Sequence, residues 1–167
     1  NPFKRAVTLY EQNNYEEAAN IMEALLTAGK GQSDSPAKPD CLMLLARSLA
    51  NLGRLTDARQ WCEQAVAAAQ LNAEGHYLLA TIYQEAGMMR ESLEALKKTV
   101  YLAPRFVMAY VNLANVARLQ GRAEEAQRHF AGAITLLDGM DAEELVPHSD
   151  GMTAQSLKQA LKQMMKQ

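Results

Sequence analysis

Residues 73–106 read AEGHYLLATIYQEAGMMRESLEALKKTVYLAPRF, and the pattern of this stretch recurs before it at 39–72 and after it at 107–140. Three columns of like residues show the recurrence: the leucines Leu45, Leu79 and Leu113, the alanines Ala46, Ala80 and Ala114, and the glycines Gly53, Gly87 and Gly121. Unrelated helical segments would not share three columns at one spacing. The chain is therefore predicted to be built from repeated units that stack on one another.

Each unit is predicted to hold two short helices that pack closely together. Leu79 and Tyr83 lie four residues apart, which places them on one face of the first helix. Small residues, Ala80 on the first helix and Ser92 on the second, allow the two helices to approach where they cross. Gly87 stands between the helices, where a positive φ after a helix end is least costly for glycine.

A period of about 34 residues made of two amphipathic helices is typical of the tetratricopeptide repeat (TPR), and the chain resembles this family. We predict an all-α fold, a TPR superhelix or α-α solenoid, with one partial and three full 34-residue repeats and a C-terminal capping helix. The TPR array is expected over residues 1–140, with repeats at about 1–32, 39–72, 73–106 and 107–140. Residues 141–167 are expected to form a turn and the capping helix.

An insertion separates the first repeat from the second. Ala18 and Ala58 occupy equivalent places, but their numbers differ by 40 instead of 34, so six residues are added. The segment 27–38, TAGKGQSDSPAK, is rich in glycine, serine and proline and is predicted to be a flexible loop. It is interpreted either as a tolerated surface insertion or as a loop or hinge that contacts a partner. The chain starts at Asn1 without an initiator methionine, and we expect it to be part of a longer protein.

Composition excludes several classes of function. The 167 residues carry a net charge of −2, which does not indicate a nucleic-acid site or a basic membrane patch. The longest apolar runs hold six residues, whereas a membrane-spanning helix needs about 20. Two cysteines, Cys41 and Cys62, are too few for a disulfide framework. Free thiols suit a reducing compartment, so a cytoplasmic location is expected.

No catalytic constellation is visible in these residues. His76, His129 and His148 do not fall at metal-ligand spacing, and no glycine-rich phosphate loop is present. Ser149 precedes Asp150 and Gly151, but the run lacks the strand-turn-helix setting of a catalytic serine and is interpreted as a turn. We therefore expect no enzyme activity, no cofactor and no metal site within this chain.

Binding is the function that the repeats favour. The resemblance to TPR proteins implies that the first helices of successive repeats line a concave groove for a protein or peptide. By helical phase, the residues that point away from the second helices are Met43, Arg47, Asn51, Tyr77, Thr81, Gln84, Asn112, Asn115 and Arg118. The last three are spaced three apart and offer amide and guanidinium donors to a peptide backbone or carboxylate. The alternative is a plain solvated helix face.

The end of the chain carries a narrower likeness. The run 145–161, LVPHSDGMTAQSLKQAL, follows the repeats. It resembles the end of CheR-type chemotaxis methyltransferases that carry TPRs after the catalytic domain, where a run SDG-(Leu/Met)-T-A-x-x-L occurs. The matching positions here are Ser149, Asp150, Gly151, Met152, Thr153, Ala154 and Leu157. This resemblance implies a parent enzyme that methylates receptor glutamates with S-adenosylmethionine. The present chain would be its docking or regulatory part, with a chemoreceptor, a signalling protein or its own methyltransferase domain as partner.

Two alternatives stay open at this point. The chain can instead be an adaptor in pilus biogenesis or protein secretion, a role that TPR proteins also fill. The final helix, expected over 153–166, carries an apolar stripe that includes Leu157 and Leu161. That stripe is interpreted as a cap on the array. Alternatively it occupies a TPR groove, in its own chain or in a second copy, which would give self-association.

Overall fold

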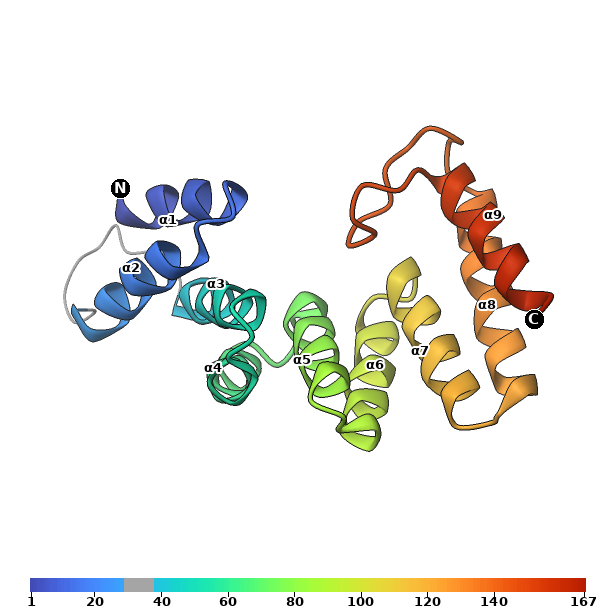
Figure 1. The fold of residues 1–167 in the computed structure, drawn as a ribbon, viewed down its shortest axis with the longest axis horizontal. Helices are drawn as coiled ribbons and strands as arrows, with labels where there is room; N and C mark the ends of the chain where they lie inside the picture. The colour runs from blue at the N-terminus through green and yellow to red at the C-terminus, as the bar shows by residue number, and fades with distance from the viewer. Residues whose placement is uncertain (29–37) are drawn as a thin grey trace. The chain divides into compact units, whose positions relative to one another are not determined.

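The computed structural model describes residues 1–28 and 38–167, and their regular secondary structure is helical (Figure 1). The helices of these residues are α1 (Pro2–Glu11), α2 (Tyr15–Ala28), α3 (Lys38–Asn51), α4 (Leu55–Ala68), α5 (Ala73–Glu85), α6 (Met89–Leu102), α7 (Val107–Leu119), α8 (Ala123–Asp138) and α9 (Ala154–Met165). The all-α prediction is thus confirmed. The first repeat has both of its helices, although α1 is short. Most of the insertion predicted at 27–38 lies outside the described residues.

The same turn joins the two helices of each repeat. Asn13, Gly53, Gly87 and Gly121 have φ values of 63°, 78°, 77° and 74°, the left-handed region that glycine and asparagine tolerate best. The residue after each of them donates its backbone N–H to a carbonyl five residues earlier, at 2.8–2.9 Å, in the pairs Asn14–Leu9, Arg54–Leu49, Met88–Tyr83 and Arg122–Ala117. This bond closes the last turn of each first helix and reverses the chain. The glycine column of the sequence has its physical reason here.

Small buried side chains lie where the paired helices cross, as predicted. Ala46 and Ala58 are fully buried, and Ala114 with Ala126 repeats the arrangement. In the repeat between them, the second small residue is polar: Ser92 is buried and its Oγ donates a hydrogen bond to the Ala80 carbonyl oxygen at 2.9 Å. The hydroxyl is therefore satisfied inside the core, where an unpaired one would be costly.

The chain divides into two compact units, residues 1–95 and 96–167, each with its own core. In the first unit, the core gathers side chains of α1 to α5 and includes Met22, Leu45 and Cys62, all fully buried. In the second unit it includes Phe130 and Leu137 of α8. The predicted leucine column is confirmed as a core column, since Leu45, Leu79 and Leu113 are 0, 7 and 3 % exposed.

The last helix closes the second unit. Leu157 and Leu161 of α9 are buried in the same core as Phe130, so the apolar stripe is used within the chain and α9 caps the array. Thr153 starts the helix: its Oγ1 accepts the backbone N–H of Ser156 at 3.1 Å. The prediction of a capping helix is confirmed.

Candidate functional site

The residues expected to bind a partner lie on the first helices α3, α5 and α7. In the first unit, α3 contacts both α1 and α5, so first helices from three repeats lie next to one another. We call the outward side of α1, α3 and α5, all in the first unit, the first-helix face. The last three predicted residues lie on α7 in the second unit and are described separately.

In the first unit, polar side chains of the first-helix face connect neighbouring repeats. Arg47 Nη2 on α3 lies 3.8 Å from Glu74 Oε2 on α5. Asn51 Nδ2 donates to the Tyr10 hydroxyl on α1 at 3.2 Å and to the Arg47 carbonyl oxygen at 2.9 Å. Asn51 is exposed and Arg47, Glu74 and Tyr10 are half-buried, so solvent still screens these contacts and each adds little stability. Their polar atoms remain near solvent, where a ligand can compete for them.

The other predicted residues of this unit differ in exposure. Met43 and Tyr77 are buried, 9 and 7 % exposed, so packing takes up both side chains. Met43 Sδ lies 3.5 Å from Asn72 Nδ2, at the start of α5. Thr81 is half-buried, and its Oγ1 donates to the Leu78 carbonyl oxygen at 2.8 Å. Gln84 is half-buried as well.

In the second unit, Asn112, Asn115 and Arg118 follow one another along α7. Asn112 and Asn115 are half-buried, whereas Arg118 is exposed near the end of the helix. The Asn115 side-chain oxygen stands apart: within the described part of the chain it is buried and accepts no hydrogen bond. A buried acceptor without a donor costs about 1–3 kcal/mol. Either an ordered water or a ligand can supply the missing donor.

Ser149, Cys62 and His129 are three groups whose side chains could in principle be reactive, and their surroundings are as follows. Ser149 is buried, and its Oγ donates to the Val146 carbonyl oxygen at 2.6 Å and accepts the Met152 N–H at 3.0 Å, which holds the turn that was expected here. Burial raises the pKa of the Cys62 thiol to about 12, so the thiol stays protonated and unreactive. Burial also lowers the pKa of His129, which lies 3.8 Å from Glu125.

The described residues contain no cluster of histidine, cysteine, aspartate or glutamate able to hold a metal ion. Within residues 1–28 and 38–167, every helix is too short or too polar to traverse a lipid bilayer.

In two repeats, a side chain near the start of the first helix bonds the connection before that helix. In α5, His76 Nε2 bonds the Gln70 carbonyl oxygen at 2.8 Å; in α7, the Tyr110 hydroxyl donates to the Pro104 carbonyl oxygen at 3.0 Å. Each bond reaches back six residues. Leu42 holds the same place in α3 and has no group that can donate.

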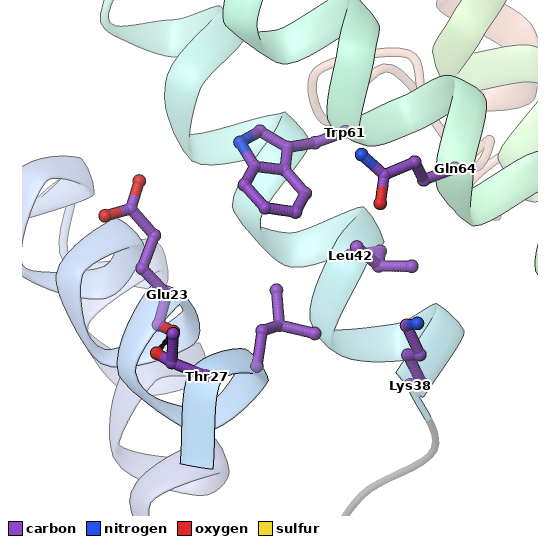
Figure 2. A pocket seen from close by; sticks show the side chains of 7 residues that line it. Glu23, Thr27, Lys38, Leu42, Trp61 and Gln64 are labelled. Atoms are coloured by element: carbon purple, nitrogen blue, oxygen red, sulfur yellow. Dashed lines mark hydrogen bonds between the residues drawn. The ribbon is translucent and has the colours of Figure 1, made fainter. Parts of the chain in front are cut away.

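A pocket opens beside Leu42, between α2, α3 and α4 (Figure 2). Its volume is about 480 Å³. Its apolar lining comes from one residue of each helix: Leu26, Leu42 and Trp61. Its polar lining consists of Glu23, Thr27, Lys38 and Gln64. We call this cavity the Trp61 pocket.

Comparison with protein families identifies the repeats. Residues 3–73, 73–106 and 107–131 each match a family described as tetratricopeptide repeat. The chain is a tetratricopeptide-repeat protein. Since TPR domains bind protein or peptide partners, it is a protein–protein interaction domain, and the TPR fold itself is non-catalytic. Among curated protein sequences, none matches the chain.

Solved TPR structures share the fold. MamA 41-end from Desulfovibrio magneticus RS-1 is similar at 21 % identity and a TM-score of 0.75, covering 84 % of this chain and 76 % of that one. TTC0263 from Thermus thermophilus follows at 24 % identity and a TM-score of 0.66, with 82 % and 73 % covered. YrrB, described as a TPR protein with an unusual peptide-binding site, is 20 % identical with a TM-score of 0.68, over 78 % and 64 % of the two chains. At these identities the likeness concerns the fold.

Two features of the structure are not predicted by the repeat pattern of the sequence. Tyr10 and Glu74 join the first-helix face through their contacts with Asn51 and Arg47, but neither belongs to a repeated column. The Trp61 pocket was not predicted from the sequence either. A leucine at 42 replaces the hydrogen-bonding residues found at the equivalent places of the next two repeats.

Proposed function

We propose that this TPR domain binds an extended peptide segment of a partner protein on the outward side of α7, with the Asn115 amide contacting the peptide backbone. The observation that supports this is the buried Asn115 oxygen without a donor. A peptide N–H would satisfy it, and the same amide can donate its NH₂ to a peptide carbonyl. Arg118, one turn further along α7, is exposed, and its guanidinium would bind a carboxylate of the partner.

Replacing Asn115 should have two effects that can be measured separately, one on stability and one on binding. Without ligand, replacing Asn115 by leucine removes an unsatisfied buried acceptor, so the variant should be as stable as the wild type or more stable. With ligand, the same replacement removes two backbone hydrogen bonds. At about 1 kcal/mol each, about 2 kcal/mol together, their loss weakens binding by roughly thirtyfold. A side chain that serves packing alone would not combine these two results.

The experiment starts from peptides selected from a random library against the wild-type domain. Their dissociation constants are then measured for wild type, Asn115→Leu and the control Gln120→Ala, an exposed position just beyond α7. We expect loss of affinity with Asn115→Leu, unchanged affinity with the control, and unchanged helical circular dichroism for both. Peptides that bind Asn115→Leu as tightly as wild type would refute the assignment of the amide to the ligand.

We further propose that the domain is the docking or regulatory part of a CheR-like protein-glutamate methyltransferase in the bacterial cytoplasm. The run from Ser149 to Leu157 supports this context. Ser149 organises the turn and Thr153 caps α9, which gives a physical reason for those two residue types. The partner would be a chemoreceptor, a signalling protein or the methyltransferase domain itself.

The reading frame that encodes this chain tests the proposed context. A methyltransferase domain encoded upstream of Asn1 would support it. An upstream signal for export would favour the alternative, an adaptor in pilus biogenesis or secretion. The peptide-binding proposal for Asn115 is independent of this outcome, because it rests on the chemistry of α7 alone.

A further inference from the structure

The Trp61 pocket lies beside a position at which this repeat differs from the next two. Where the next two repeats place His76 and Tyr110, side chains that bond the preceding connection, this repeat places Leu42. Leu42 is 1 % exposed and contributes to an apolar cluster with Met43 and Ala65, against which Leu26 and Trp61 pack. A cavity of about 480 Å³ lies beside Leu42.

The pocket combines an apolar interior with charges of opposite sign at its edge. Figure 2 shows the Trp61 ring above Leu42, with Glu23 on one side and Lys38 on the other. Both charged residues are exposed, and no described residue forms an ion pair with either. Its volume falls within the ~300–1,000 Å³ typical of ligand sites, which are mostly apolar with a few polar groups that set orientation.

Helix ends reinforce this separation of charge. Glu23 lies in the second half of α2, whose C-terminus carries the negative end of the helix dipole. Lys38 is the first residue of α3, whose N-terminus carries the positive end. The pocket is thus negative towards α2 and positive towards α3. A ligand with one charge, or with none, would leave at least one of these edges without a counter-charge.

We propose that the Trp61 pocket binds one large apolar side chain of a partner peptide, with a basic residue of that peptide towards Glu23 and an acidic residue towards Lys38. The apolar side chain packs on Trp61, Leu26 and Leu42, and the flanking charges fix the direction in which the peptide lies. This site is formed by α2, α3 and α4 of the first unit. It is separate from Asn115 and does not depend on the function proposed for that residue.

Trp61 gives the site its own reporter, because it is the only tryptophan of the chain. The probes are acetylated peptide amides that carry one phenylalanine between an arginine and a glutamate, at graded spacings. Titration into the intact wild-type domain should give a saturable shift of Trp61 emission with at least one of them. The same peptide with phenylalanine changed to alanine should give none. A set of peptides that leaves the emission unchanged, or acts equally with alanine, would overturn the proposal.

Charge exchange tests the direction of the peptide. Glu23→Lys and Lys38→Glu are changes of exposed residues, so both variants should fold as the wild type does. Each should lower the affinity for the best peptide by up to about fivefold, the upper end of the range of exposed ion pairs. The double variant should recover affinity for the peptide in which arginine and glutamate have changed places. Equal binding of both peptides to the double variant would contradict the assigned direction.

A filling variant tests the cavity itself. Leu42→Tyr introduces the residue found at the equivalent place in α7 and should abolish the emission shift. Leu71→Tyr, at a position 84 % exposed, is the matched control and should respond as the wild type does. Asn115→Leu should leave the shift unchanged, which separates a failure of this proposal from a failure of the peptide site on α7.

Discussion

Truncation of Leu45 gives a quantitative test of the repeated core. Leu45 is 0 % exposed and lies in the core of the first unit. Leu45→Ala removes three buried carbon groups, worth about 2.4 kcal/mol of transfer free energy at roughly 0.8 kcal/mol each. The cavity that remains raises the expected loss in the free energy of unfolding to about 3–4 kcal/mol. For a chain of this size, that loss corresponds to a fall of about 6–16 °C in Tm.

The matched control is Leu71→Ala. It removes the same atoms from a side chain that is 84 % exposed in the same unit, so the expected change is within about 0.5 kcal/mol. Urea unfolding followed by circular dichroism gives the difference between the two variants, provided that the slope m is unchanged. If Leu45→Ala shifts the midpoint no more than Leu71→Ala does, the leucine column is not the core of the repeats.

Two further predictions concern single hydrogen bonds. Thr153→Ala should cost about 1 kcal/mol and speed amide exchange in the first turn of α9, because the Ser156 N–H loses its acceptor, whereas Thr153→Ser should retain the cap. Burial and the hydrogen bond to Glu63 raise the pKa of Tyr83 from 10.0 to about 12. The unfolded chain therefore loses the Tyr83 proton at a lower pH than the folded chain does. The protonated hydroxyl stabilises the fold fully below pH 10, and this contribution is lost as the pH rises through about 12. Between pH 10 and 12 the urea midpoint of Tyr83→Phe should fall less steeply with pH than that of the wild type. Parallel pH profiles of the two proteins would show that the pKa of Tyr83 is not raised.

The repeats were predictable because each local signal has one physical meaning. A glycine after a first helix marks the left-handed turn, and Asn13 could be assigned to the same role from its tolerance of that conformation. Spacing by four residues identified the buried face of each helix, including Leu79. These signals need only the geometry of one hairpin. The chain supplies them with few conflicts between local preference and packing.

The predicted binding residues were harder to derive, because exposure depends on how one repeat covers the next. Helical phase alone placed Met43 on the outward face, but the start of α5 brings Asn72 against its sulfur. The opposite difficulty applies to Asn115. Its place on α7 followed from the sequence, whereas the lack of a donor for its oxygen can be known only from the surrounding backbone. Sequence periodicity gives the face of a helix but not the partners of each atom.

The bonds made by His76 and Tyr110 also fix the lengths of the connections that they span. An extra residue between Gln70 and His76 would carry the carbonyl out of reach and leave a ring nitrogen unpaired in a buried side chain, at a cost of about 1–3 kcal/mol. Leu42, at the equivalent place in α3, does not constrain the length of the connection before it, because leucine requires no hydrogen-bond acceptor. Epitope tags or reporter domains can therefore be spliced between residues 28 and 38 without a penalty from this column, whereas the two later junctions should reject them.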